Sequence, residues 1–257
     1  MSDTRNMPQT MIPEGRSSIL ATKTCDTPDF RWVGLEKIAW RDPNGGTREW
    51  ECAFRTTRRS ECDGVAILAF VRYPISGKED EILLVSQFRP PVTAEVIESP
   101  AGLVDAGEHG TVAAERELLE ETGFFGRVTC VSPIVPCDPG MTNANMRFVT
   151  MVVDGDAEEN RNPTPKPDDG EFITVRRLPL SSLQDGLNAF AEAGFQVDAR
   201  LYAMALGYTL GASATELTKP PSQRTWWTHC AVGTAAAAVT AVVLGVAVAV
   251  AGKRGGR

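Results

Sequence analysis

Three glutamates, Glu117, Glu120 and Glu121, lie three and four residues apart in a stretch predicted to form a helix over residues 111–122. At this spacing all three carboxylates project from one face of the helix. Like charges at this spacing repel each other by roughly 0.2–0.5 kcal/mol per pair. A hard divalent cation, which prefers oxygen ligands, would compensate for that repulsion. The alternative is a solvated acidic helix face, which is the commoner origin of a charge run.

The same segment contains a longer pattern of fixed spacing, in the string GLVDAGEHGTVAAERELLEETGF. It resembles the Nudix box, and the matching positions are Gly102, Glu108, Arg116, Glu117, Leu118, Glu120, Glu121 and Gly123. Phe124 stands where the pattern has an aliphatic residue. The resemblance implies an α+β fold, built as a Nudix-type α/β/α sandwich around a mixed sheet. It also implies hydrolysis of a nucleoside diphosphate linked to another group.

The resemblance also implies a metal site that uses Mg²⁺, with Mn²⁺ as an alternative. Its ligands would be the carbonyl oxygen of Ala101 and the carboxylates of Glu117, Glu120 and Glu121. Glu120 would also assist catalysis, and Arg116 would orient the glutamates. The chemistry suits this set, because divalent ions neutralise the charge of a pyrophosphate and lower the pKa of an attacking water.

Strings outside the box resemble the ADP-sugar pyrophosphatases over residues 32–206. The strings are RWVGLEK, REWECAFRTTRR, QFRPP, ESPAGLVDAGE, CDPGMTN, KPDDGEF and VDARLYAMAL. This resemblance implies a homodimer that hydrolyses ADP-ribose and related ADP-sugars to AMP and ribose 5-phosphate, by attack of metal-activated water on the pyrophosphate. Two alternatives stay open. One is a broader nucleoside-diphosphate hydrolase that removes oxidised nucleotides such as 8-oxo-dGDP, and the other is a membrane-tethered adaptor that binds ADP-ribose without cleaving it.

The resemblance extends to substrate-binding residues. Trp32 and Trp50 match a pair of tryptophans that sandwich the adenine, and stacking of a base on an aromatic face contributes about 1–3 kcal/mol. Arg55 and Arg89 match arginines that hold the substrate, since guanidinium groups suit phosphate oxygens. Glu98 matches a further acidic residue of the site. The alternatives are core packing for the tryptophans, surface ion pairs for the arginines and a strand-edge carboxylate for the glutamate.

Two loops complete the implied site. Asp138, Gly140 and Met141 match a loop that reaches the ribose bound by a neighbouring subunit, although Cys137 stands where the family commonly has methionine. Glu171 matches a glutamate on a mobile loop that acts as general base, and a flexible acidic loop suits a residue that closes over substrate. The alternatives are a plain Pro-Gly turn and a solvated loop carboxylate.

The composition is that of a globular protein. The 257 residues are 42% hydrophobic and 23% charged, which excludes wholesale disorder and an all-membrane protein. The net charge of −7 argues against nucleic acid as a partner. The N-terminus has no apolar run like that of a secretory signal peptide, and the six cysteines form no C-x-x-C pair. We therefore expect the body of the protein in a reducing compartment, the cytosol.

Hydrophobic periodicity and turn residues predict the elements of an α+β domain. A turn at residues 42–46 should join the first two strands as a hairpin. The predicted strands span residues 31–41, 47–58, 64–73, 81–88, 96–101, 127–135, 146–153 and 172–177. The predicted helices span residues 111–122, 180–194 and 198–210.

The C-terminal region differs from the rest of the chain. Residues 230–252 contain no charged side chain, and as a helix they would be about 34 Å long, enough to cross a membrane. Trp226 and Trp227 precede this stretch and a basic tip follows it, in the arrangement of interfacial anchors. The stretch is mostly alanine and valine, so an Ala-rich helix packed on the domain and a low-complexity tail are the alternatives.

These observations divide the chain into five parts. We expect a flexible N-terminal segment over 1–28, a Nudix hydrolase domain over 29–210, a linker over 211–229, a transmembrane tail anchor over 230–252 and a basic tip over 253–257. The catalytic domain would then face the cytosol from a membrane. A short anchor with a basic tip resembles those of the mitochondrial outer membrane, and the endoplasmic reticulum and peroxisome are the alternatives.

Overall fold

The structure is a computed structural model that describes residues 17–218. The chain divides after Ser181 into two compact units. The predicted tail anchor and basic tip lie outside the described residues. Within residues 17–218, no helix has the length and apolar character needed to cross a bilayer.

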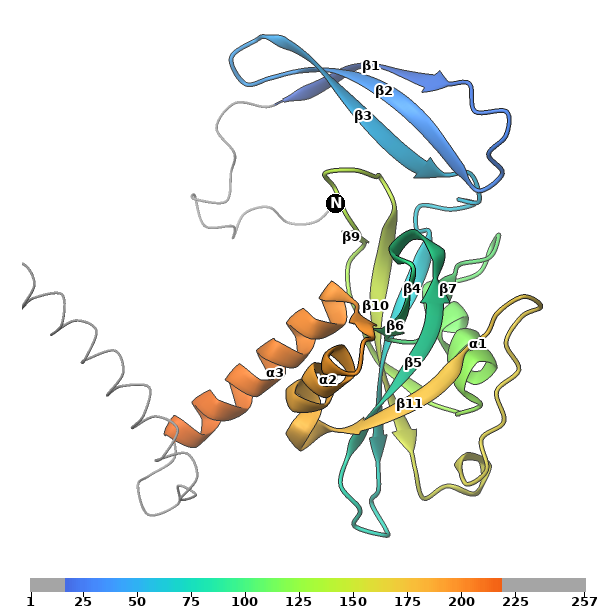
Figure 1. Cartoon of the computed structure of the whole chain (residues 1–257), viewed down its shortest axis with the longest axis vertical. Coiled ribbons are helices and arrows are strands. Elements are labelled where there is room, and N and C mark those ends of the chain that lie inside the picture. Colours follow the sequence, from blue (N-terminus) through green and yellow to red (C-terminus); the bar gives the residue numbers. More distant parts are fainter. Residues whose placement is uncertain (1–16, 219–257) are drawn as a thin grey trace, which may run out of the picture. The chain divides into compact units, whose positions relative to one another are not determined.

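A three-stranded antiparallel sheet begins the first unit (Figure 1). It consists of β1 (Ser18–Cys25), β2 (Val33–Arg41) and β3 (Thr47–Arg55), in that order. The Asp42 carboxylate accepts the N–H groups of Asn44 and Gly46, at 3.0 and 2.8 Å, and these bonds fix the turn between β2 and β3. The predicted hairpin is confirmed.

Strand β1 was not predicted, because residues 1–28 were expected to be a loose segment. That expectation is wrong for residues 18–25, which pair with β2 from Ser18 opposite Arg41 to Cys25 opposite Leu35. Prolines at positions 8, 13 and 28 favour an irregular segment. A strand held mainly by pairing with a neighbour leaves little signal in its own sequence.

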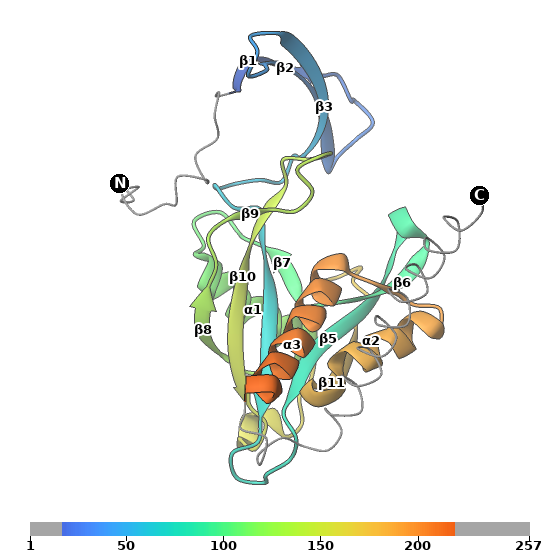
Figure 2. The same cartoon turned by 90° about the vertical axis from the view of Figure 1, so that its left-hand side faces the viewer.

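A mixed sheet forms the centre of the first unit. Its order is β6-β5-β4-β10-β8, with β11 also paired to β5, β7 to β4 and β9 to β10. Figure 2 shows β4 between β10 and β5; the β4–β10 pair is parallel, and the other pairs in the sheet run antiparallel. The strands are β4 (Gly64–Arg72), β5 (Glu81–Arg89), β6 (Ala94–Glu98), β7 (Ala101–Leu103), β8 (Arg127–Val131), β9 (Val135–Pro136), β10 (Asn145–Asp154) and β11 (Thr174–Pro179).

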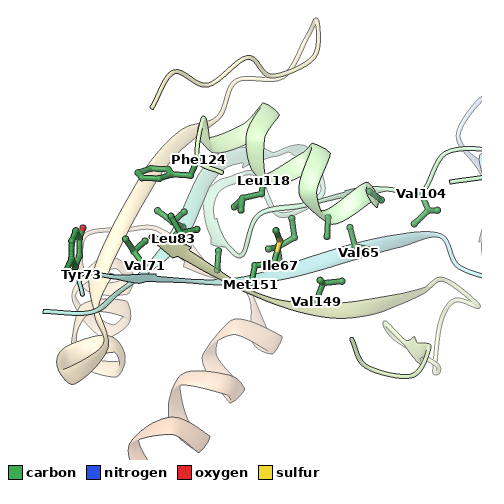
Figure 3. Close-up of a cluster of buried hydrophobic side chains, with 14 residues drawn as sticks. Val65, Ile67, Val71, Tyr73, Leu83, Val104, Leu118, Phe124, Val149 and Met151 are labelled. Atoms are coloured by element: carbon green, nitrogen blue, oxygen red, sulfur yellow. The ribbon is translucent and has the colours of Figure 1, made fainter. Parts of the chain in front are cut away.

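Helix α1 (Gly110–Thr122) packs on this sheet and carries the glutamate face. The core of the unit lies between α1 and the strands, where Ile67, Leu118 and Met151 are fully buried (Figure 3). The predicted helix and its end at Gly123 are confirmed. Glu121 is buried on the same helix, three residues after Leu118, so the packing of α1 on the sheet also sets the position of the glutamate face.

The second unit contains two helices, α2 (Leu183–Glu192) and α3 (Ala199–Thr218), joined by a hydrogen bond from the Tyr202 hydroxyl to Asn188 Oδ1 at 2.9 Å. Helix α3 continues eight residues beyond its predicted end at residue 210, so the prediction of a linker is wrong for residues 211–218. Gly211 alone does not stop the helix, because good helix formers follow it and no proline occurs before position 220. The remaining elements of the described residues are short. In the first unit they are η3 (Pro90–Val92) and η4 (Glu158–Asn160), η5 (Leu180–Ser182) lies at the boundary of the two units, and β12 (Gln196–Val197) lies in the second.

Gly123 ends α1 with a positive φ of 74° and lies against the backbone of a later loop. A Cβ at this position would lie 2.6 Å from the carbonyl carbon of Thr164. We predict that Gly123→Ala lowers the free energy of unfolding by about 2–4 kcal/mol. The loss combines the strain of a left-handed backbone with the steric clash of the new methyl group against the loop. Urea denaturation measures the change.

Gly45→Ala is the matched control, since Gly45 also has a positive φ, 86°, but a Cβ there would meet nothing within 4 Å. Gly45→Ala should lower the free energy of unfolding by only about 1–2 kcal/mol, because it introduces left-handed backbone strain without a clash. Equal losses in the two variants would contradict the packing argument.

Candidate active site

Glu121 is the most deeply buried of the three glutamates on α1, with 2% of its surface exposed. Its Oε2 accepts the backbone N–H of Ala101, at the start of β7, at 3.0 Å. Burial raises the pKa of Glu121 to about 8; the Ala101 N–H opposes the rise, and the negative charges of Glu117 and Glu171 add to it. The structure thus brings Glu121 and Ala101 together, as the sequence predicts for two ligands of one metal.

Glu117 lies against the backbone of Gly102, the residue that follows Ala101 in β7. A Cβ at Gly102 would collide with the Glu117 carboxylate, so only glycine leaves room for this side chain. Burial raises the pKa of Glu117, while the hydrogen bond from Arg116 opposes that rise. Gly102 is the first position of the pattern in the sequence, and its close contact with Glu117 is the steric reason for a glycine there.

Arg116 connects the acidic side chains of the site. Its guanidinium donates to both oxygens of Glu108, at 3.0 and 2.9 Å, to Glu117 at 2.8 Å and to Glu120 at 3.0 Å. A further bond to the carbonyl oxygen of Leu103, at 3.0 Å, ties the arginine to the end of β7. The bonds from Arg116 lower the pKa of Glu108. Arg116 is therefore placed to orient the glutamates.

The carboxylates are held by these partners rather than grouped around one point. Among the residues that the structure describes, no three Asp, Glu, His or Cys side chains stand close enough together to hold a metal ion. The donor set nevertheless fits a hard divalent cation, because Glu117 and Glu121 are oxygen donors whose burial and mutual repulsion disfavour their ionised forms. A cation of charge +2 would relieve both penalties.

Further predicted residues act on the same carboxylates. Arg89, at the end of β5, opposes the rise in the pKa of Glu121 and donates to Glu98 Oε2 at 2.8 Å. Glu171 raises the pKa of both Glu117 and Glu121. It lies in an exposed turn in which its N–H donates to the carbonyl oxygen of Asp168 at 3.0 Å. The structure therefore places Arg89 and Glu171 in the electrostatic field of the glutamate helix.

The predicted adenine and ribose residues lie around β3. The indole Nε1 of Trp50 donates to the carbonyl oxygen of Gly140 at 3.1 Å, and the Ala53 N–H donates to that of Met141 at 2.9 Å. Trp50 is 50% exposed, and Trp32 is 58% exposed with the Arg31 guanidinium 4.3 Å from the centre of its ring. These exposures argue against core packing as the explanation for either tryptophan.

The structure does not bring the two tryptophans together within one chain. Trp32 lies opposite Thr56, whose N–H donates to the Trp32 carbonyl oxygen at 3.3 Å. Trp50 lies opposite Ile38, six positions away along β3. Six residues of strand span roughly 20 Å, which is far more than the thickness of a base. A single adenine therefore cannot contact both rings of the same chain in this arrangement.

Comparison with known proteins identifies the family. The NUDIX domain family matches residues 66–200, more than half of the chain. The chain belongs to the Nudix family. The resemblance drawn from the box is therefore confirmed.

Relatives narrow the assignment within the family. The chain is 46% identical over 196 residues to an ADP-ribose pyrophosphatase of Saccharomyces cerevisiae, covering 76% of this chain and 84% of the relative. It is 42% identical over 178 residues to an ADP-sugar pyrophosphatase of Mus musculus, covering 68% and 81%. The fold also matches a crystal structure of an ADP compounds hydrolase with a TM-score of 0.53 and 19% identity, over 80% of this chain and 98% of that one. These similarities confirm the resemblance to the ADP-sugar pyrophosphatase subfamily.

Gly102→Ala tests the geometry of the glutamate site. The added methyl group would displace the Glu117 carboxylate, which is the movable end of a side chain, so the fold should persist while the site is distorted. We predict a loss of about tenfold or more in Mg²⁺ affinity, measured by titration calorimetry, with little change in thermal stability.

The control is Gly110→Ala, at the first position of α1. A Cβ there would lie 3.5 Å from Arg147 Cδ and 3.6 Å from Val65 Cγ1, which are ordinary contacts. This variant should bind Mg²⁺ like the wild type. Unchanged Mg²⁺ affinity in Gly102→Ala would show that the close packing of Glu117 on β7 has no part in the metal site.

Proposed function

We propose that this protein hydrolyses ADP-ribose and related ADP-sugars to AMP and ribose 5-phosphate. The proposal rests on the contacts that Glu117 and Glu121 make with β7. Arg89 and Glu171 lie close enough to these glutamates to affect the pKa of Glu121. The names of the yeast and mouse relatives support the substrate class. The fold similarity to the ADP compounds hydrolase supports the architecture, for which we propose the complete α/β/α sandwich.

Nudix hydrolases use a divalent metal, and the residues that would hold Mg²⁺ or Mn²⁺ here are Glu117, Glu120, Glu121 and the carbonyl group of Ala101. The bound metal would neutralise pyrophosphate charge and lower the pKa of the attacking water. Arg116 fixes the glutamates before substrate arrives. The Glu171 carboxylate would accept a proton from the attacking water while the water oxygen bonds to phosphorus and the P–O bond to the bridging oxygen breaks, which releases AMP and ribose 5-phosphate.

Substrate binding would involve the arginines Arg55 and Arg89, the two tryptophans and the loop next to β3. Arg89 and Arg55 offer guanidinium groups to phosphate oxygens, with Glu98 holding Arg89 in place. Trp32 and Trp50 offer exposed aromatic faces to the adenine. The loop of Asp138, Gly140 and Met141 would contact ribose.

We also propose that the protein is a homodimer. The separation of Trp32 and Trp50 along the sheet supports this proposal, because a base held between both rings needs one tryptophan from each of two chains. Apolar side chains exposed on the same three-stranded sheet, such as Ile19 and Leu35, would then be covered by the second copy.

A kinetic panel with the full-length protein and Mg²⁺ tests the proposed reaction. We predict that kcat/KM is highest for ADP-ribose among ADP-ribose, ADP-mannose, NADH and 8-oxo-dGDP. Glu171→Gln should lower kcat by about 10²–10⁴-fold, because it removes the proton acceptor while keeping the size of the side chain.

The other outcomes identify the rival functions. A preference for 8-oxo-dGDP would favour the broader hydrolase of oxidised nucleotides. Binding of ADP-ribose without turnover by the wild-type protein would favour the adaptor. Full activity in Glu171→Gln would refute its role as the base.

We further propose that residues 230–252 anchor the protein in a membrane, with the catalytic domain on the cytosolic side. The uncharged stretch and its flanking residues support this, and the mitochondrial outer membrane is favoured over the endoplasmic reticulum or peroxisome. Carbonate extraction of cells expressing the full chain should leave it in the membrane pellet. A chain that ends at residue 222 is the matched control and should be released; release of both would refute the anchor.

A further inference from the structure

A bidentate ion pair lies outside the residues assigned to substrate or metal. Arg58, in the connection between β3 and β4, donates from Nε to Asp63 Oδ1 at 2.8 Å and from Nη2 to Asp63 Oδ2 at 2.5 Å. Asp63 is 4% exposed. A buried carboxylate with two parallel bonds to one guanidinium is a rigid, directional contact.

The same pair holds the end of the loop that carries Gly140 and Met141. Asp63 Oδ2 accepts the N–H of Asn145 at 3.0 Å, and Asn145 Oδ1 accepts the N–H of Asp63 at 2.9 Å. Arg58 Nη2 also donates to the carbonyl oxygen of Asn143 at 2.6 Å. Burial opposes ionisation of Asp63, but these bonds outweigh it and lower the pKa of Asp63.

Asp63 also connects to the strand that carries the metal-side residues. Its carbonyl oxygen accepts the N–H of Val104 at 3.1 Å, and Val104 directly follows β7, which contains Ala101 and Gly102. One residue is therefore bonded through its side chain to the substrate loop and through its backbone to the glutamate side of the site.

The substrate loop is held from its other side by β3. The Asn143 N–H donates to the Ala53 carbonyl oxygen at 3.3 Å, next to the bond from Ala53 to Met141. Trp50 and Arg55 belong to this same strand, and Arg58 follows three residues later. The position of β3, the loop and β7 relative to one another thus depends on the contacts of Arg58 and Asp63.

We propose that Arg58 and Asp63 are positioning residues that hold β3 and the loop of Gly140 and Met141, which offer contacts to adenine and ribose, in place relative to β7, which carries the metal-side residues. This inference rests on the proposed function. Neither residue contacts the glutamates of α1 through a bond in the described structure, so their loss should weaken binding of the adenylate part and spare the chemical step. The expected signature is a rise in KM with kcat retained.

Arg58→Lys is the main variant, because lysine keeps a positive charge beside Asp63 and loses the bidentate geometry. We predict that KM for ADP-ribose rises about tenfold while kcat stays within about twofold of the wild type. The double variant Arg58→Ala/Asp63→Asn removes both charges and should show the same split. It remains informative even if Arg58→Ala alone fails to fold, since it leaves no unpaired buried carboxylate.

Arg48→Lys is the matched control. Arg48 makes a similar bond to a buried aspartate, from Nε to Asp42 Oδ2 at 2.9 Å, but at the hairpin end of β3. Its KM and kcat should both match the wild type. A fall in kcat without a change in KM for Arg58→Lys, or an equal rise in KM for Arg48→Lys, would overturn the proposal.

AMP binding in EDTA provides a readout that requires neither metal nor turnover. Arg58→Lys should weaken the affinity for AMP about tenfold, measured by titration calorimetry. Unchanged AMP affinity would overturn the positioning role. Failure of the wild-type protein to hydrolyse ADP-ribose, with AMP affinity still dependent on Arg58, would instead refute the proposed function and leave the positioning role standing.

Discussion

The buried carboxylate of Glu121, hydrogen-bonded to the Ala101 N–H, is the contact around which the site is arranged. Keeping a carboxylate there requires that α1 approach β7 closely, and Gly102 permits that approach. The approach is maintained by Leu118, which lies three residues before Glu121 on α1 and packs into the core. Arg116 then compensates part of the negative charge that this arrangement concentrates.

The substrate side of the site depends on long-range hydrogen bonds rather than on a helix. Trp50 and Met141 come from segments about ninety residues apart. The two segments are joined by the indole N–H of Trp50, which donates to the carbonyl oxygen of Gly140. Asp63 links this side to β7 through the Val104 N–H. The position of the substrate loop relative to β7 is therefore set by the protein before substrate binds, and such preorganisation avoids part of the entropy cost of ordering the site.

Local spacing made the glutamate helix predictable. The pattern ending at Gly123 specified the helix, its C-terminus and the common face of its glutamates, because all of these follow from helical geometry over a few turns. The separation of Trp32 and Trp50 was not predictable in the same way, because it depends on strand register. The bond between Asp63 and the Asn145 N–H joins residues 82 positions apart, and no local pattern specifies it.

At pH 7 the raised pKa keeps a proton on Glu121, and a divalent cation bound there would displace it. Its pKa rises from an ordinary value near 4.5 to about 8, so between these values the folded protein holds a proton that the unfolded chain lacks, and metal-free stability falls as the pH rises through this window. Titration calorimetry of Mg²⁺ at pH 7, in buffers of different ionisation enthalpy, counts the protons released. We predict release of about one proton, abolished in Glu121→Gln; Mg²⁺ binding without proton release would contradict protonation of Glu121.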